Sequence, residues 1–190
     1  MVRSSPPQAV LLVDGYNIIG TWPSLQALRD GQNLRSARQQ LVNILINYSA
    51  FRGYETQLVF DAQYANGTQG RGGHSRHERM THTLSVHYTK FGETADSYIE
   101  KSCSRFRQDM RRFEQRLIVA TSDRAQQLTV VGYGAECMSA AQLAADVDLA
   151  RQQQLSKQGQ TRRSPNRLLA NHLDPQVRQQ LARLRRGDRC

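Results

Sequence analysis

Aspartates follow three short apolar segments of this 190-residue sequence. The first of them, residues 9–13, is a short continuous apolar run, as expected of a strand that is buried on both faces of a sheet, and the other two are also expected to be strands. Because the C-terminal ends of parallel strands lie along one edge of a sheet, these aspartates are expected at the same edge. The segments and the acids that follow them are residues 9–13 with Asp14, residues 57–60 with Asp61, and residues 117–120 with Asp123.

Two further acids, Asp96 and Glu100, are one helical turn apart near the start of a predicted amphipathic helix. The helix is expected over residues 94–116. If residues 83–88 form a strand that leads into this helix, the N-terminal end of the helix lies at the same sheet edge. The apolar residues of the helix are spaced 4, 3, 4 and 3 positions apart, as one helix face requires, and are Ile99, Cys103, Phe106, Met110 and Phe113.

Carboxylates gathered in this way repel one another unless a cation neutralises them. Mg²⁺ suits carboxylate and water ligands, and two such ions about 3.5–4 Å apart serve many nucleases and phosphatases. Asp14, Asp96 and Asp123 are the acids expected to share a metal site. Each of them could instead be only a helix cap or turn residue, Asp61 could be a turn former, and Glu100 could be a solvated helix residue.

Strands that alternate with helices over residues 8–154 predict an α/β domain with a mainly parallel sheet. Residues 62–79 are expected to form a long polar loop with four glycines. The other expected elements are a helix over residues 33–52 that ends at Gly53, a short helix from Ser122 to about residue 128, a strand over residues 136–138, and a helix that starts with a Ser139 and Gln142 capping box and ends near residue 153.

Several other α/β enzyme classes lack their signatures here. The phosphate-binding patterns GxxxxGK[ST] and GxGxxG are absent, and so is the GxSxG pattern of serine hydrolases. A haloacid dehalogenase would need an aspartate where this sequence has Tyr16. Four histidines and three cysteines fit no common zinc spacing, so surface histidines and a reducing cytoplasm are expected. They are His74, His77, His82, His87, Cys103, Cys137 and Cys190.

Positive charge is concentrated at the C-terminal end of the chain. The sequence has 26 Lys and Arg against 16 Asp and Glu, a net charge of +10, and residues 151–190 hold ten of the bases and two of the acids. Such an excess indicates an anionic partner, nucleic acid before a membrane surface, and no apolar run approaches the roughly 20 residues of a membrane span. We therefore expect a domain over residues 8–154 and a basic tail over residues 155–190. The tail is expected to be a linker with a short helix, either solvated or an arm for RNA or a ribonucleoprotein surface.

Four segments, in this order, resemble the NYN domain, a branch of the PIN-like nucleases. They are Asp-Gly-Tyr-Asn at 14–17, Val-Phe-Asp at 59–61, Glu-Thr-Ala-Asp at 93–96 with its continuation to residue 100, and Thr-Ser-Asp at 121–123. The YacP-like family, which includes a ribosome-associated endoribonuclease, is the most similar. The resemblance covers residues 8–154 and leaves the basic tail outside. It implies a parallel sheet with helices on both faces and an acidic pocket that binds Mg²⁺ or Mn²⁺.

The resemblance also implies a function. The chain would be a metal-dependent endoribonuclease that hydrolyses phosphodiester bonds in RNA, with mRNA on the ribosome as a candidate substrate. A catalytically silent RNA- or ribosome-binding module with the same fold is the alternative. The implied residue roles are metal-holding acids at Asp14, Asp96 and Asp123, orientation of Asp14 or a metal-bound water by Asn17, and outer acids at Asp61 and Glu100.

Arginines beside the proposed edge are candidates for holding the RNA backbone, because a guanidinium pairs with a phosphate through two hydrogen bonds. Aromatic side chains there could stack on an unpaired base. The alternative for the long loop is an ordinary connection with solvated arginines. The candidates are Arg71, Arg76 and Arg79 after Asp61, Arg124 next to Asp123, and Tyr16, Tyr64 or Trp22 for stacking.

Overall fold

The structure is a computed structural model that describes residues 7–31, 33–61 and 75–162, with side chains described as far as residue 157. The chain separates into two compact units, Met1–Arg151 and Gln152–Cys190. The described part of the second unit is the continuation of one helix. All the strands of the described residues lie in the first unit.

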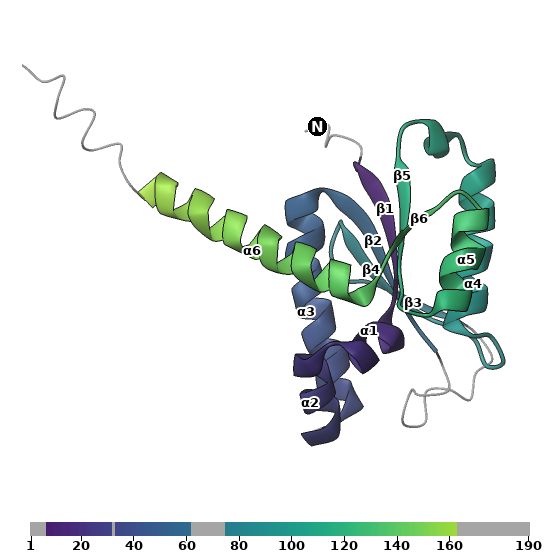
Figure 1. Ribbon diagram of the computed structural model, residues 1–190, viewed down its shortest axis with the longest axis horizontal. Coiled ribbons are helices and arrows are strands. Elements are labelled where there is room, and N and C mark those ends of the chain that lie inside the picture. The colour runs from purple at the N-terminus through teal and green to yellow at the C-terminus, as the bar shows by residue number, and fades with distance from the viewer. Residues whose placement is uncertain (1–6, 32, 62–74, 163–190) are drawn as a thin grey trace, which may run out of the picture. The chain divides into compact units, whose positions relative to one another are not determined.

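A six-stranded sheet forms the centre of the first unit, with the strand order β3-β4-β2-β1-β5-β6 (Figure 1). β3 pairs with β4 in the antiparallel sense, and every other pair of neighbours is parallel. The predicted, mainly parallel sheet is therefore confirmed. The strands are β1 (Ala9–Asp14), β2 (Tyr54–Phe60), β3 (Arg76–Arg79), β4 (Leu84–Tyr88), β5 (Arg116–Ala120) and β6 (Glu136–Met138).

Helices cover both faces of this sheet, as predicted. Figure 1 shows α1, α2 and α3 on one face and α4 and α5 on the other. The start of α6 belongs to the face of α3, because Ala140 and Leu143 join the same apolar cluster as Leu41 and Leu45. Within the described ranges, none of the helices has the length and apolar content needed to cross a membrane. The helices are α1 (Gly15–Thr21), α2 (Pro23–Gly31), α3 (Leu34–Arg52), α4 (Ala95–Gln108), α5 (Arg124–Gly132) and α6 (Ala140–Arg162).

Side chains of the central strands alternate between two apolar clusters, because successive residues of a strand point to opposite faces. In β1, Leu11 and Val13 join the cluster on the side of α3, whereas Leu12 joins the cluster on the side of α4. In β2, Leu58 and Val59 divide in the same way. Because β1 pairs in parallel with both β2 and β5, the C-terminal ends of these three buried strands lie at one edge of the sheet.

The helix predicted over residues 94–116 is shorter than expected. α4 ends at Gln108, and Asp109 takes an extended conformation (φ −83°, ψ 142°) and caps the 3-10 helix Met110–Phe113. The chain has to turn here because β5 must begin next to the start of β1. Met110 and Phe113 continue the apolar spacing in sequence, but they are 78% and 69% exposed.

Other elements also differ from the predictions, among them α5, whose N-cap is Asp123 and not Ser122 and which ends at Gly132. α1 and α2 occupy a segment for which no element was expected. Pro23 begins α2 at a position where the missing N–H of proline costs little. β3 lies within the expected loop over residues 62–79, because four residues without an apolar pattern pair with the open edge of β4. α6 continues to Arg162 because its Gln- and Lys-containing segment has good helix propensity.

One histidine of the expected surface group is buried. His77 and His82 are exposed and His74 lies outside the described residues, but His87 is only 6% exposed. The alternation along β4 places His87 under α4, where its ring stacks on Tyr98 with centroids 3.9 Å apart. Burial lowers the pKa of His87, which favours a neutral imidazole. The surface prediction is therefore wrong for this residue.

Candidate active site

Asp14 is the most buried carboxylate among the described residues, with 8% of its surface exposed. It is the last residue of β1 and the N-cap of α1, where its Oδ1 accepts a hydrogen bond from the backbone N–H of Asn17 at 3.1 Å. Gly15 follows it because a Cβ there would overlap the ring of Phe60. The absence of a side chain lets the strand turn directly into a helix against the core, which holds Asp14 at the sheet edge.

Asn17 connects two of the strand ends. Its side-chain oxygen accepts a hydrogen bond from the backbone N–H of Ser122 at 2.8 Å, across 105 positions of sequence. Ser122 in turn accepts a hydrogen bond on its Oγ from the backbone N–H of Ala140 at 3.0 Å. The Asn17 side chain therefore connects the β1–α1 turn to the segment between β5 and α5.

Asp96 and Asp123 meet through a glutamine that sequence analysis did not single out. Asp96 lies in the first turn of α4 and accepts a hydrogen bond from the side-chain amide of Gln126. Gln126 is 3% exposed and lies in the first turn of α5. Asp123 is exposed and caps that helix, accepting hydrogen bonds from the N–H groups of Ala125 at 2.8 Å and of Gln126 at 3.4 Å. A polar side chain facing another helix leaves no signal in a single sequence.

The two outer acids also lie at this edge. Asp61 follows β2 and accepts a hydrogen bond from the backbone N–H of Ala95, so it helps to cap α4. Glu100 lies one helical turn after Asp96, is half-buried, and is near enough to raise the pKa of Asp96. The alternative stated for Asp61 is a turn former, whereas its contact with Ala95 places it as a cap of α4. Its charge acts on both Asp14 and Asp96.

The pKa values of the carboxylates reflect their convergence. Burial raises the pKa of Asp14 to about 6, the hydrogen bond from Asn17 opposes this, and the charges of Asp96 and Asp61 add to the rise. Burial also raises the pKa of Asp96, followed by the charges of Asp123, Asp61 and Glu100. Within the described part of the chain, no lysine or arginine is among the main influences on Asp14, Asp61 or Asp96. The edge therefore concentrates negative charge that a cation would relieve.

The donors at this edge suit a hard, hydrated cation. All the candidate ligand atoms are carboxylate oxygens, which Mg²⁺ and Mn²⁺ prefer. In the described residues, no three His, Cys, Asp or Glu side chains are placed so that they could hold a metal ion together. Mg²⁺ commonly binds through one or two carboxylates and keeps several waters. The residues therefore fit such an ion with waters between it and some of the acids, and the three-aspartate ligand set stays a prediction.

The sequence model of the YacP-like NYN domain matches residues 11–186. The chain belongs to this family. The match extends past residue 154, where the resemblance was expected to end, so most of the basic tail lies inside the family's pattern. The PIN-like fold expected from the NYN resemblance is confirmed, and membership supports a nuclease-like, RNA-related function.

Relatives of the YacP-like chain come from Bacillus subtilis. The uncharacterized protein YacP of strain 168 is 34% identical over 139 residues, which are 73% of this chain and 75% of YacP. The crystal structure of Rae1 (YacP) is 30% identical, with a TM-score of 0.64, and covers 94% of this chain and 95% of Rae1. The crystal structure of a point mutant of Rae1 is 28% identical, with a TM-score of 0.65, and covers 92% of this chain and 98% of the mutant.

The predicted RNA-binding arginines of the YacP-like chain do not form one group. Arg71 lies outside the described residues. Arg76 and Arg79 are exposed on β3, where Arg76 pairs with Glu78 and Arg79 donates to backbone carbonyl groups. Arg124 is exposed at the start of α5, next to Asp123. The structure therefore brings Arg124 beside the acids and puts Arg76 and Arg79 on the edge strand.

Three aromatic rings form a wall beside Asp14 that the sequence indicated only in part. The Tyr16 and Phe60 centroids are 5.0 Å apart, and those of Phe60 and Tyr88 are 5.7 Å apart. Burial raises the pKa of Tyr16 to about 12, so its hydroxyl stays protonated. Arg38 of α3 lies at the wall, donates to the Tyr16 hydroxyl at 3.5 Å, and its charge acts on both tyrosines. No pattern in the sequence distinguishes Arg38 from the other polar residues of this amphipathic helix.

The other two aromatic candidates are not part of this wall. Tyr64 lies outside the described residues. Trp22 is 7% exposed, and its indole N–H donates to the backbone oxygen of Ala140 at 2.8 Å. The prediction that Trp22 could stack on a base is wrong, because its ring is part of the core between α1 and the start of α6.

Proposed function

We propose that this YacP-like chain is a metal-dependent endoribonuclease that hydrolyses phosphodiester bonds in RNA. The observation that carries the proposal is the buried Asp14 carboxylate, surrounded by further carboxylates at the C-terminal edge of a parallel sheet. A module that only bound a polyanion would gain nothing from this negative charge. Mg²⁺ or Mn²⁺, when bound, would activate a water and stabilise the leaving oxygen.

Each residue of the edge has a part in the proposal. Asp14, Asp96 and Asp123 hold the cation, directly or through waters. Asn17 keeps the β1–α1 turn in register with Asp123, and Asp61 and Glu100 are outer acids that add negative charge. Arg124 and the arginines after Asp61 neutralise RNA phosphates.

The proposal also includes a substrate, a partner and a cellular location. The substrate is RNA, with mRNA on the ribosome as the candidate that the family resemblance suggests, and the ribosome is then a partner. The basic residues of 155–190 would add affinity for either of these polyanions. The proposed location is the cytoplasm, because the three scattered cysteines do not indicate a disulfide framework and Cys103 is free and buried.

A catalytically silent RNA- or ribosome-binding module is the second candidate. The observation in its favour is that Asp96 and Asp123 are already engaged by Gln126 and by the α5 N-terminus. In the part of the chain that the structure describes, three ligands are not poised around one point. A chelator experiment separates the two candidates.

Removal of divalent cations is the direct test of the proposal. The full chain is expected to cut single-stranded RNA, or mRNA on ribosomes, in Mg²⁺ or Mn²⁺. It is expected to stop in EDTA and to recover when the cation is returned. Gel analysis of the products measures cleavage, and filter binding measures affinity in parallel. Cleavage that continues in EDTA contradicts the metal-dependent mechanism, and binding without cleavage of any RNA supports the silent module.

Arg38→Ala is expected to weaken RNA binding without impairing the chemical step. Arg38 is half-buried at the aromatic wall, where a phosphate next to a base stacked on Tyr16 could reach it. Loss of a charge-assisted contact should raise KM by roughly tenfold or more and leave kcat nearly unchanged. Arg38→Lys should retain part of the affinity, and Arg151→Ala, an exposed arginine on α6, is the matched control. A fall in kcat at unchanged KM would assign Arg38 to the acids instead of the substrate.

A further inference from the structure

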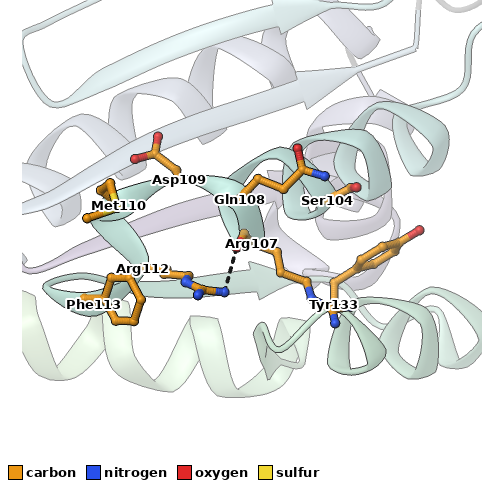
Figure 2. Close-up of a pocket in the computed structure, with 8 residues that line it drawn as sticks. All are labelled: Ser104, Arg107, Gln108, Asp109, Met110, Arg112, Phe113 and Tyr133. Carbon is orange, nitrogen blue, oxygen red and sulfur yellow. Dashed lines mark hydrogen bonds between the residues drawn. The ribbon is translucent and has the colours of Figure 1, made fainter.

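A pocket opens where the apolar stripe of α4 runs past the end of the helix. Its volume is about 590 Å³, within the roughly 300–1,000 Å³ range of small-molecule sites. Figure 2 shows side chains from the end of α4, from the 3-10 helix Met110–Phe113 and from the end of α5 around it. The exposed Met110 and Phe113 form part of its lining.

Two arginines and two aromatic rings line this pocket. In Figure 2, Arg112 and Arg107 lie between the rings of Phe113 and Tyr133. The Arg112 guanidinium lies 4.5 Å from the centroid of the Phe113 ring, and its Nη1 donates to the Arg107 carbonyl oxygen at 3.0 Å. A guanidinium stacked on an exposed ring offers a flat apolar face and a charged rim together.

The positive charge of this pocket is not neutralised within the described residues. Asp109 is the one acid among the lining residues, and its carboxylate pairs with Arg111 at 2.9 Å. Arg111 also lies 3.6 Å from Glu55. Among the described side chains, no ion pair involves Arg107 or Arg112. Both arginines are exposed, so their guanidinium groups can meet an anion.

The pocket is separate from the acidic edge. α4 has 14 residues, and a helix rises about 1.5 Å per residue, so its two ends are about 20 Å apart. Asp96 lies at the N-terminal end of α4, and the pocket lies at the C-terminal end. In Figure 1 the turn between α4 and β5 lies at the opposite end of the sheet from α1.

We propose that this pocket is a second contact site for single-stranded RNA, with an unpaired base stacked on Phe113 and backbone phosphates paired with Arg107 and Arg112. Aromatic platforms flanked by arginines are how proteins hold unpaired bases and their phosphates. The proposal rests on RNA as the substrate of the proposed function, and it adds an anchor remote from the bond that is cut. A strand held at both ends of α4 would gain affinity from the second contact without any change at the acids.

The test is RNA binding by the full chain in EDTA, so that no cleavage is needed. The probe is an unpaired oligonucleotide of about 20 nucleotides, longer than the roughly 16 nucleotides of the largest single-strand sites. Phe113→Ala should lower affinity about fivefold or more. Phe113→Trp should restore it, and the new indole should be quenched on binding. Because Trp22 is buried, the exposed tryptophan can be followed separately.

The arginines are tested through the salt dependence. Arg107→Ala with Arg112→Ala should reduce the slope of log K against log salt by about 1.4, since each phosphate contact on a single strand contributes about 0.7. The matched control is Arg29→Ala with Arg151→Ala, which removes the same charge from exposed positions outside the pocket. Affinity for a blunt RNA duplex should not respond to Phe113→Ala, because its bases are already stacked.

Unchanged RNA affinity in Phe113→Ala overturns the proposal. So does a loss of affinity in Arg29→Ala with Arg151→Ala that equals the loss in Arg107→Ala with Arg112→Ala, because general charge attraction would then explain both. Polyglutamate that competes at the pocket while these variants keep full RNA affinity would assign it to an acidic protein segment instead. If the parent never cleaves RNA but Phe113→Ala still weakens binding, the proposed function fails and this site stands.

Discussion

Asp96→Asn is expected to abolish RNA cleavage and to leave RNA binding intact or tighter. Asp96 is the carboxylate on which the other acids converge, since the charges of Asp123, Asp61 and Glu100 all act on it. The substitution is nearly isosteric, and the new amide oxygen can still accept the hydrogen bond of Gln126, so the packing should survive. An amide is a poorer ligand for a hard cation than a carboxylate. The rate should fall by orders of magnitude, while repulsion of the RNA phosphates decreases.

The measurement pairs a cleavage assay with filter binding, with and without Mn²⁺. The double variant Asp14→Asn, Asp96→Asn should be no slower than either single variant, because residues that serve one site do not contribute additively. Asp30→Asn, an exposed aspartate on α2, is the matched control and should cleave like the parent. Cleavage by Asp96→Asn at the parent rate would contradict the proposed function, whatever the affinity.

Asp14→Asn is expected to stabilise the metal-free protein at neutral pH while it inactivates the enzyme. The pKa of Asp14 is about 6 in the folded chain, against an ordinary value of 3.8. The folded state therefore holds a proton that the unfolded state releases, and stability falls as pH rises from about 4 to about 6. Above that range the parent carries a penalty on the order of 2–3 kcal/mol that asparagine does not. Asparagine is also as good an N-cap as aspartate.

Urea unfolding in EDTA, repeated between about pH 4 and pH 8, measures this difference. Asp14→Asn should unfold at higher urea than the parent at about pH 8. This difference should nearly vanish at about pH 4, where Asp14 is protonated in the folded state and partly protonated in the unfolded state. Asp123→Asn is the matched control, because Asp123 is also an N-cap but is exposed. Mn²⁺ should narrow the gap by stabilising the parent. A variant that is less stable than the parent at neutral pH would show that burial of Asp14 carries no such cost.

Sequence alone determined the class of fold and the strands that carry the acids. The run over residues 9–13 is apolar at every position, which only burial on both faces explains, and β1 is the central strand. Alternation of such runs with helical patterns required parallel pairing, and parallel pairing brings Asp14, Asp61 and Asp123 to one edge. The four ordered segments that hold these three acids and Asp96 were enough to indicate the NYN resemblance.

Tertiary structure alone decided what surrounds those acids. Gln126, Arg38 and the Asn17 contact to Ser122 join parts of the chain that are distant in sequence, and no local pattern records such pairs. Helical spacing predicted that Met110 and Phe113 continue the core, but the need to return the chain to β5 ended α4 at Gln108 and exposed both. The spacing of apolar residues shows which residues share one face of a helix, but it does not show where the helix ends. Where the helix must end is decided by strand pairing elsewhere in the sheet, because the backbone groups of β5 can be satisfied only beside β1 and β6.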